Sequence, residues 1–396
     1  MSDVKKEAKI TSVKRFLQPP TRSSFLFGPR GTGKTTWLRQ VFGQVPTLDL
    51  LDRETYRLYS ARPERLRDWI AAQNNPEWVV IDEVQRIPEL LDVVHQVMEE
   101  GIGIKFILTG SSARKLKRAG VNLLAGRASV MTLHPFMAAE LGLDFNLDKA
   151  LETGLVPVVH ASNNRLETLN AYLGVYLDQE VKAEALVRNV GDFSRFLEVI
   201  SFSHGSQLNI AEVAREVQIN RNTAQGYVSV LEDLLLGFTV PVFSRRAKRV
   251  LVNHAKFYYF DAGVFRAARP RGPLDKLEEI GGAALEGFVA QHLQSWLAYR
   301  KGNDAKLYYW RTKSGNEVDF VVYGENVFAA IEVKNSKQIF SKDVKSLKTF
   351  KEDYPEATVF LSYRGCERVL MDGVLCIPCQ DFLQTLHPHK PFPVFL

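Results

Sequence analysis

A glycine-rich segment near the amino terminus constrains the fold more than any other part of the chain. It reads FLFGPRGTGKTTWLRQ over residues 25–40, with Gly28 followed after four residues by Gly33, Lys34 and Thr35. This spacing fits the phosphate-loop pattern G-x-x-x-x-G-K-[ST], in which backbone N–H groups and a helix N-terminus converge on phosphate oxygens. An apolar, strand-like run precedes the glycines and a helical stretch leaves at Lys34. A chance glycine turn is the alternative, and these flanks disfavour it.

The side chains of the loop indicate what it would hold. Lys34 can reach the β- and γ-phosphates of a nucleotide, and the Thr35 hydroxyl can bind Mg²⁺. Glycines at 28, 31 and 33 allow the backbone to approach the phosphates closely. The loop therefore predicts ATP and Mg²⁺ as cofactors.

An acidic pair follows a buried strand in the segment WVVIDEVQRI, residues 78–87. Asp82 would hold Mg²⁺, directly or through water, as the Walker B element requires. Glu83 would orient and polarise the attacking water, which makes ATP hydrolysis the expected reaction. The alternative is an acidic pair that caps the next helix, near Pro88.

A third strand, in KFILTGSSARKLKR over residues 105–118, ends in hydroxyl side chains that include Thr109, Ser111 and Ser112. A hydroxyl at that edge would lie beside the Walker strands and could sense the γ-phosphate. The residues expected to contact the nucleotide are Gly28, Pro29, Arg30, Gly31, Thr32, Gly33, Lys34, Thr35, Thr36, Asp82 and Thr109.

The periodicity of apolar residues divides the 396-residue chain into three parts. Short apolar runs alternate with amphipathic helical stretches up to about Pro135, which is typical of a parallel sheet covered on both faces. A helical part follows, and strands return from about Lys256. We therefore expect an α/β protein with a nucleotide-binding domain over 1–165, a helical domain over 166–265 and a strand-rich domain over 275–396, the last two joined by the basic stretch RAARPRGPLDK.

The chain resembles a large group of bacterial and archaeal AAA-type ATPases with a carboxy-terminal half of uncharacterised function. The segments that carry the resemblance in the first half are GPRGTGKTT, IDEVQ, LTGSSARKL, NLLAGR and HPF. Those in the second half are LLGF, FYYFDAG, LEGFV, YYWRTKSGNEVDF and IEVK. The resemblance implies that Thr109 occupies the sensor 1 position. It makes Arg127 a candidate catalytic arginine for the γ-phosphate, in cis or from a neighbour, with Arg114 as a competitor.

An arginine that acts from a neighbour would require a homo-oligomer. The plainer interpretation of Arg127 is a salt-bridged residue at the flank of a strand. No spacing rule decides between them.

The middle part contains two short helices around a tight turn, in residues 208–238. Such a pair is typical of a helix-turn-helix, and the segment after it can form a β-wing, giving a winged-helix domain. The wing would carry cations for DNA phosphates, and the outer face of the second helix would carry side chains able to read base edges. A helical protein–protein module is the alternative. The wing cations are Arg245, Arg246, Lys248 and Arg249, and the outward residues of the helix are Arg221, Asn222, Gln225 and Ser229.

The strand-rich part holds a second candidate active site in NEVDFVVYGENVFAAIEVK, residues 316–334. Glu332 and Lys334 are two residues apart, so they project from one face of a strand, and Asp319 on the preceding strand can share that face. Two carboxylates could hold Mg²⁺ in line with a phosphodiester while Lys334 assists catalysis. This arrangement resembles the PD-(D/E)xK core of restriction-endonuclease-like proteins, with Val318 where the motif has proline. By that resemblance Glu286 would add a metal-binding carboxylate.

An exposed hairpin with scattered charges is the alternative to this site. Preserved ligands permit cleavage without proving it. The residues therefore leave open whether a phosphodiester is cut.

The charge balance, the absence of long apolar segments and the cysteine content indicate the class of partner and the cellular compartment. Lysine and arginine number 51 against 45 acidic residues, and the formal net charge of +6 suits an anionic partner, which composition alone cannot name. The amino terminus lacks an apolar signal region and no run is apolar enough to span a membrane, so we expect a cytoplasmic protein without a membrane partner. The three cysteines fit a reducing compartment. The CIPC at 376–379 is either part of a zinc site or the end of a buried strand.

Together these features predict an ATPase whose nucleotide state controls DNA binding and, through the second site, metal-dependent DNA cleavage. A nucleotide-dependent regulatory switch that binds partners without cutting nucleic acid is the main alternative. A chaperone-like ATPase that acts on protein is a third interpretation, which salt-dependent nucleic-acid binding would exclude.

Overall fold

The computed structural model describes residues 13–74, 76–111, 114, 116, 126–177, 189–245, 247–252, 254–300, 302 and 304–393. The chain divides into two compact units, which are described separately. One consists of residues 17–134 with 233–235. The other holds residues 135–232 and 236–393, with the described residues before Leu17, apart from the gaps just given.

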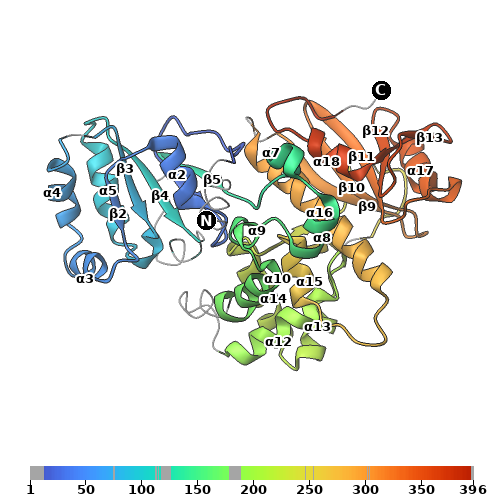
Figure 1. The fold of residues 1–396 in the computed structure, drawn as a ribbon, viewed down its shortest axis with the longest axis horizontal. Helices are drawn as coiled ribbons and strands as arrows, with labels where there is room; N and C mark the ends of the chain where they lie inside the picture. Colours follow the sequence, from blue (N-terminus) through green and yellow to red (C-terminus); the bar gives the residue numbers. More distant parts are fainter. Residues whose placement is uncertain are drawn as a thin grey trace. The chain divides into compact units, whose positions relative to one another are not determined.

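The first unit is built on a five-stranded parallel sheet with the strand order β2-β3-β4-β1-β5 (Figure 1). This confirms the predicted parallel α/β architecture. The elements are β1 (Ser24–Phe27), α2 (Lys34–Phe42), β2 (Thr47–Asp49), α3 (Arg53–Ala61), α4 (Arg65–Ala71), β3 (Trp78–Asp82), the 3-10 turn η1 (Val84–Arg86), α5 (Leu90–Glu99), β4 (Lys105–Gly110) and β5 (Ser129–Thr132).

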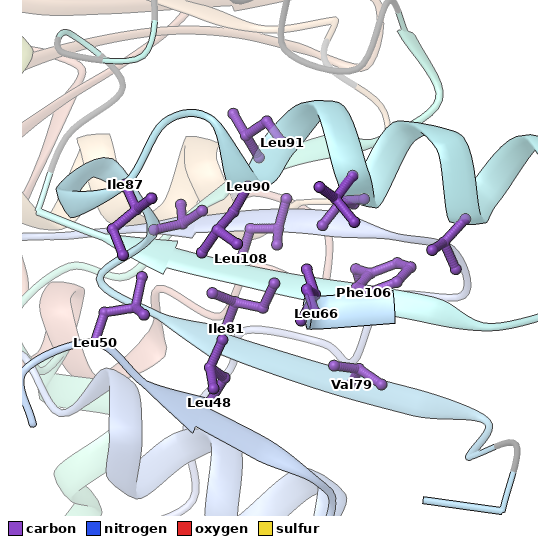
Figure 2. Close-up of a cluster of buried hydrophobic side chains, with 14 of the residues drawn as sticks. Leu48, Leu50, Leu66, Val79, Ile81, Ile87, Leu90, Leu91, Phe106 and Leu108 are labelled. Carbon is purple, nitrogen blue, oxygen red and sulfur yellow. The ribbon is translucent and has the colours of Figure 1, made fainter. Parts of the chain in front are cut away.

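An apolar core holds the helices of this unit against the sheet. Strands β3 and β4 bury Ile81 and Leu108, and α5 contributes Leu90 and Leu91 to the same cluster (Figure 2). All four side chains are at most 1% exposed. Burial of such side chains contributes roughly 1.5–3 kcal/mol each, so this cluster fixes the strand ends that carry the polar residues.

The first half of the second unit is mainly helical. Its elements are α7 (Ala138–Leu141), η3 (Gly142–Asp144), α8 (Leu147–Thr153), α9 (Pro157–Ala161), α10 (Arg165–Ala171), η4 (Tyr172–Leu177), α12 (Val190–Ser201), β6 (Ser206–Gln207), α13 (Ile210–Val217), α14 (Arg221–Asp233), β7 (Gly237–Val240), β8 (Lys256–Tyr259), α15 (Ala262–Ala268) and α16 (Leu277–Tyr299). Three short strands form an antiparallel sheet with the order β6-β8-β7.

Helices α13 and α14 form the expected helix pair. The turn between them begins at Gln218, which has φ 62°, a left-handed conformation that reverses the chain in few residues. Tyr227, Val230 and Leu231 are buried and form the inner face of α14. Asn209 caps α13 by accepting a hydrogen bond from the Glu212 backbone N–H at 3.3 Å.

The carboxy-terminal part is a six-stranded sheet with the order β13-β14-β12-β11-β10-β9. A turn at 314–316 joins β9 and β10, which pair antiparallel, whereas β11, β12 and β14 are parallel. Phe350 and Leu347 of α17 lie in the apolar core of this part, which also includes Trp310 of β9. The elements are β9 (Lys306–Arg311), β10 (Glu317–Gly324), β11 (Val327–Lys334), η5 (Ser341–Val344), α17 (Lys345–Asp353), β12 (Thr358–Tyr363), β13 (Val369–Met371), β14 (Val374–Pro378) and α18 (Cys379–Thr385).

The division into units differs from the predicted domain boundaries. The first unit ends at His134, short of the predicted boundary at 165, because α8 packs on α15 and α16, whereas the sheet ends with β5. The predicted domains 166–265 and 275–396 belong to one compact unit. Cys376 and Cys379 are both buried, the first within β14, as the strand-end interpretation expects.

Candidate functional site

The phosphate loop follows β1 and closes on itself before α2 begins. The Thr32 hydroxyl donates to the Pro29 carbonyl at 2.6 Å, which holds the turn. Gly33 has φ 89°, a conformation that glycine adopts at low cost. A Cβ at Gly28 would lie 2.5 Å from the Leu133 carbonyl oxygen, so a larger residue there would displace the loop. The local backbone geometry therefore requires glycine at both positions 28 and 33.

Lys34 and Thr35 open helix α2 at the carboxyl edge of the sheet. Lys34 is buried, and its Nζ donates to the Gly28 carbonyl at 2.7 Å. The Thr35 hydroxyl lies 3.5 Å from Asp82 Oδ2 at the end of β3. Hydroxyl and carboxylate oxygens are ligands that Mg²⁺ accepts, so Thr35 and Asp82 fit the predicted metal. Of the other loop residues expected at the nucleotide, Arg30 is exposed, Thr36 is half-buried and Pro29 is buried.

The strand order brings Thr109 into this site. Because β4 lies between β1 and β3, its carboxyl end separates the phosphate loop from Asp82. The Thr109 hydroxyl donates to Asp82 Oδ1 and accepts from the Glu83 backbone N–H at 3.1 Å. Thr109 is fully buried, so its contacts fix both members of the acidic pair.

Glu83 adopts a backbone conformation that is unusual for its residue type. Its φ is 60°, in the left-handed region, where a non-glycine residue is uncommon and often marks a functional position. Gln85 Nε2 donates to Glu83 Oε2 at 2.6 Å and to the Ser111 hydroxyl at 3.3 Å. Sequence reasoning missed Gln85, and its place in the segment IDEVQ was the only signal. Ser112 lies outside the described residues.

Close packing under Gln85 depends on a glycine. A Cβ at Gly110 would lie 2.4 Å from Gln85 Oε1, so any side chain there would move the glutamine. Gln85 is 4% exposed. The glutamine therefore holds the Glu83 carboxylate from a confined position.

Arg127 lies away from the phosphate loop. It precedes β5, whose first residue, Ser129, pairs with Ser24 at the start of β1, whereas the loop follows the end of β1. A four-residue strand spans roughly 13 Å, so the two lie at opposite edges of the sheet. Arg127 instead pairs with Glu99 at 2.7 Å and His95 at 2.7 Å. The expected contact in cis is thus not made, and the contact from a neighbour stays a prediction.

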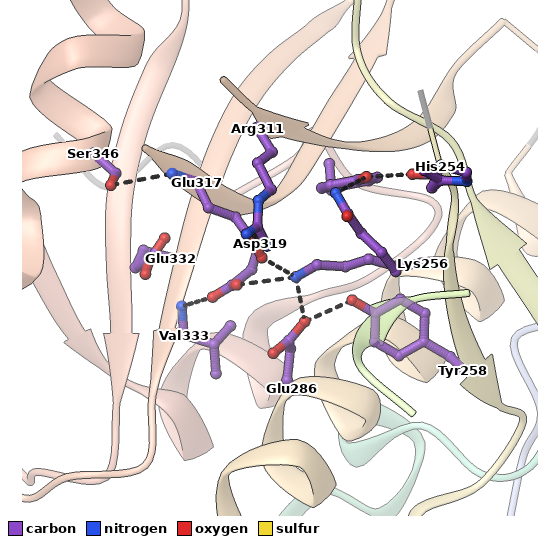
Figure 3. A network of polar contacts seen from close by, with 12 residues as sticks. His254, Lys256, Tyr258, Glu286, Arg311, Glu317, Asp319, Glu332, Val333 and Ser346 are labelled. Carbon is purple, nitrogen blue, oxygen red and sulfur yellow. Dashed lines mark hydrogen bonds and ion pairs between the residues drawn. The ribbon is translucent and has the colours of Figure 1, made fainter. Parts of the chain in front are cut away.

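The second predicted site also comes together, but with an additional residue at its centre. Lys256, the first residue of β8, is 2% exposed and extends its ammonium among three carboxylates (Figure 3). The distances from its Nζ are 2.9 Å to Glu286 Oε1, 2.5 Å to Glu317 Oε1 and 3.5 Å to Asp319 Oδ1. Sequence reasoning assigned no role to Lys256 or Glu317. A lone lysine in an apolar strand carries no local signal of its partners.

The carboxylates of this cluster have further partners. The Tyr258 hydroxyl donates to Glu286 Oε1 at 2.6 Å, and the Val333 backbone N–H donates to Asp319 Oδ2 at 2.9 Å. Lys334 Nζ donates to Glu332 Oε1 at 2.6 Å, which confirms that these two side chains share a face of β11.

Burial and charge shift the acid–base behaviour of the cluster. Burial opposes the charge of Lys256, yet Glu286, Tyr258 and the other carboxylates keep its pKa well above the ordinary value. Burial raises the pKa of Glu286 to about 7, although the ammonium of Lys256 lowers it. Burial and the neighbouring Asp319 raise the pKa of Glu332 well above its usual range. The cluster is a tightly coupled set of charges, shielded from solvent.

Residues 241–245 and 247–252, which belong to the predicted wing at 236–260, lie against the carboxy-terminal sheet. The Phe243 backbone N–H donates to the Tyr309 carbonyl at 2.7 Å, and its side chain belongs to the carboxy-terminal core. The Arg249 Nε donates to Asp353 at 2.8 Å, Lys248 donates to the Glu352 carbonyl at 3.3 Å, and Arg245 lies over the Tyr323 ring. Arg246 lies outside the described residues.

The second helix of the pair presents polar residues to solvent. Arg221, Asn222 and Gln225 of α14 are exposed, and Ser229 is half-buried. The Ser229 hydroxyl donates to the Gln225 carbonyl within the helix at 3.1 Å. Three of the four predicted base-reading residues are therefore accessible.

Comparisons with known families match three parts of the chain. Residues 21–142 match an AAA domain (AAA_14), which contains the phosphate loop, Asp82, Glu83 and Thr109. This match supports the expectation that residues 21–142 form an AAA-type domain with a nucleotide-dependent activity. Residues 145–275 and 281–382 each match a domain of unknown function, DUF8612 and DUF4143 respectively.

Similar proteins extend over most of the chain. Uncharacterized proteins of Mycobacterium tuberculosis and Mycobacterium bovis are each 28% identical over 369 residues, which is 91% of this chain and 80% of the relative.

Solved structures give weaker matches. The replication initiator DnaA bound to AMPPCP and single-stranded DNA is 11% identical, with a TM-score of 0.28 over 57% of this chain and 86% of that one. A signal transduction ATPase with numerous domains from Pyrococcus horikoshii is 12% identical, with a TM-score of 0.22 over 70% and 44%. Scores of this size do not establish a shared overall fold. Within the described residues, no helix has the length and apolar character needed to cross a membrane.

Proposed function

We propose that this protein binds and hydrolyses ATP. The observation that carries the proposal is the convergence of Lys34, Thr35, Asp82, Thr109 and Glu83 at the carboxyl edge of β1, β3 and β4.

Each residue has a distinct task in this proposal. Lys34 and the loop N–H groups bind the phosphate oxygens, and Thr35 and Asp82 would hold Mg²⁺, which neutralises phosphate charge when bound. Thr109 fixes the orientation of Asp82 and senses the γ-phosphate. Glu83 orients the attacking water and accepts its proton.

Two substitutions separate binding from hydrolysis. Lys34→Ala should abolish ATP binding, measured by calorimetry. Glu83→Gln should bind ATP with wild-type affinity and hydrolyse it roughly 10²-fold or more slowly, since a general base contributes about 10²–10⁴.

Lys105→Ala is a matched control for the loss of a lysine. Lys105 begins β4 at the opposite edge of the sheet and pairs with Glu77 at 3.2 Å. Its loss should therefore leave both the ATP affinity and the rate of ATP hydrolysis unchanged. Wild-type nucleotide affinity in Lys34→Ala, or wild-type turnover in Glu83→Gln, would refute the assignment.

DNA binding is the second candidate function, and we propose helix α14 as the element that makes it. The exposed Arg221, Asn222 and Gln225 lie on one helix after a tight turn, in a chain of net charge +6. Arginine, asparagine and glutamine are the side chains that pair with base edges in a major groove. The order α12, β6, α13, α14, β7, β8 is consistent with a winged-helix domain in which the wing is docked.

We further propose that nucleotide state regulates this binding. Of the two outcomes considered for the carboxy-terminal part, a switch without phosphodiester cleavage is better supported, because Lys256 lies among the carboxylates that cleavage would need for Mg²⁺. The test is DNA affinity measured with ATP, ADP and no nucleotide. Equal affinity in all three states would refute the coupling.

A further inference from the structure

The carboxylate cluster does not fit the metal ion that its resemblance to restriction-endonuclease-like proteins implies. A bound Mg²⁺ needs near-octahedral oxygen ligands at 2.0–2.1 Å. Here the ammonium of Lys256 lies within 3.5 Å of oxygens from Glu286, Glu317 and Asp319, so the space between these carboxylates is taken by a cation of the protein itself. Among the residues that the structure describes, no group of three or more metal-ligating side chains could hold an ion.

The remaining carboxylate oxygens are also largely engaged. Asp319 uses its second oxygen for the Val333 backbone N–H, and Glu317 uses its second oxygen for Arg311 at 2.7 Å. Glu332 accepts from Lys334 through Oε1, and its Oε2 is buried and has no hydrogen-bond partner among the described residues. Glu332 Oε2 and Glu286 Oε2, the oxygen of Glu286 that does not face Lys256 or Tyr258, are too few for the near-octahedral set that Mg²⁺ needs.

The lysine is held in place from several sides. Its strand, β8, pairs with both β6 and β7, so the Lys256 backbone is fixed in a sheet. Tyr258, two residues further on, lies on the same face of β8 and donates to the same Glu286 oxygen as Lys256 (Figure 3). The Tyr309 ring lies 5.4 Å from Nζ and adds a cation–π contact.

We propose that Lys256 is a built-in counter-ion that takes the place of a divalent metal in this cluster. The ammonium joins β8 of the small sheet to α16 and to β10 of the carboxy-terminal sheet, and so fixes the helix pair to the carboxy-terminal domain as one body. The cluster consequently binds no divalent cation and cuts no phosphodiester. This inference concerns a site separate from the nucleotide site, and it does not depend on ATP hydrolysis.

The first test is metal binding by the full-length, nucleotide-free protein. Mn²⁺ binding, followed by electron paramagnetic resonance, should be the same for wild type and for Asp319→Asn. Labelled DNA should stay intact with Mn²⁺ or Mg²⁺. Mn²⁺ binding that disappears in Asp319→Asn, or cleavage that disappears in Lys334→Ala, would overturn the proposal.

The second test is the thermal stability of lysine variants. Lys256→Met keeps the length of the side chain but leaves three buried carboxylates without their cation, and we expect the melting temperature to fall by roughly 10 °C. Lys334→Met is the matched control, because the Lys334 side chain is 34% exposed and its ion pair among the described residues is with Glu332, so its effect should be smaller. Removing a carboxylate together with the lysine, in Lys256→Met with Glu286→Gln, should restore part of the loss.

Three outcomes support or overturn the proposed role of Lys256 as a stabilising counter-ion. If Lys256→Met does not fold, the counter-ion role is supported and the metal measurement on wild type decides the rest. A Lys256→Met variant as stable as wild type would overturn it. So would a double variant in which the two losses simply add, because charges in contact must show coupling.

Discussion

At the scale of single residues, the proposed nucleotide site depends on side chains that position other side chains. Thr109 orients Asp82 and the Glu83 backbone, and Gln85 holds the Glu83 carboxylate. Gln85 itself has room only because residue 110 is glycine. A general base must lie within hydrogen-bond reach of the water that it activates, so the position of the Glu83 carboxylate matters as much as its presence.

Loss of Gln85 should therefore impair hydrolysis without impairing ATP binding. In Gln85→Ala the Glu83 carboxylate loses the donor at 2.6 Å, and we expect kcat to fall roughly 10-fold or more while the affinity for ATP stays at the wild-type value. Steady-state hydrolysis and calorimetry measure the two quantities. Gln96→Ala is the matched control, since Gln96 is exposed on α5 and contacts Arg67. A fall in ATP affinity with unchanged kcat would contradict this role.

At the scale of elements, buried polar contacts join helices that are distant in sequence. His292 of α16 accepts a hydrogen bond through Nε2 from the Ala138 backbone N–H at 2.9 Å, at the start of α7. Its Nδ1 lies 2.8 Å from the Phe288 carbonyl. Only the neutral ring with its proton on Nδ1 satisfies both contacts, because a protonated Nε2 would face an N–H donor. The helix contact thus fixes one protonation state.

His292 should consequently remain neutral well below the ordinary pH of histidine titration. Burial lowers its pKa to about 4, against the hydrogen bond to Phe288, which raises it. Because this pKa lies below the unfolded value of about 6.5, its contribution to stability is complete above pH 6.5 and is lost as the pH falls toward 4. The loss is on the order of 1.4 kcal/mol for each pH unit in that interval.

Nuclear magnetic resonance of ¹⁵N-labelled histidine measures this directly. The ring nitrogens of His292, assigned by their absence in His292→Gln, should keep the neutral Nδ1–H pattern from pH 8 to about 5. A His292 ring that becomes doubly protonated near pH 6.5 would show that the contact with α7 is not maintained.

At the scale of the whole molecule, the sequence predicted local patterns well and long-range partners poorly. The phosphate loop, the strands that carry Asp82 and Thr109 at their carboxyl ends and the helix pair all follow from short-range spacing, and the structure contains each of them. The position of Arg127 depends on strand direction, and the partners of Lys256 lie 30 to 63 residues away in the chain. No local spacing encodes such pairings.

The domain boundary and the wing show the same limit. The sequence assigns the helices that follow the parallel sheet to the same domain as the sheet. In the structure α8, one of these helices, packs against α15 and α16 of the second unit. The sequence predicts a projecting wing that carries Arg245, Lys248 and Arg249, yet Phe243 in the same segment is buried in the carboxy-terminal core. A run of charged residues in a sequence indicates that the segment is exposed. Where that exposed segment lies in the fold is decided by its buried residues, here Phe243.

The docked wing changes which cations should matter for DNA. Arg249 pairs with Asp353, which is 7% exposed, and this contact ties residues 241–252 to the carboxy-terminal domain. Arg221 lies on exposed α14, beside Asn222 and Gln225. We therefore expect Arg221→Gln to lower DNA affinity and to reduce the slope of log K against log salt by about 1, the value for one lost phosphate contact.

Arg249→Gln supplies the comparison, because it removes the same charge from the same unit. It should lower the melting temperature by roughly 2–4 °C, the equivalent of about 1 kcal/mol, and leave the salt slope unchanged. Fluorescence anisotropy at several salt concentrations and thermal unfolding give the two readings. If Arg249→Gln flattens the salt slope while Arg221→Gln does not, then the wing contacts DNA after all and α14 does not. If neither variant changes the salt slope, then neither Arg221 nor Arg249 contacts a DNA phosphate. The helix pair would then be better explained as a surface for a protein partner.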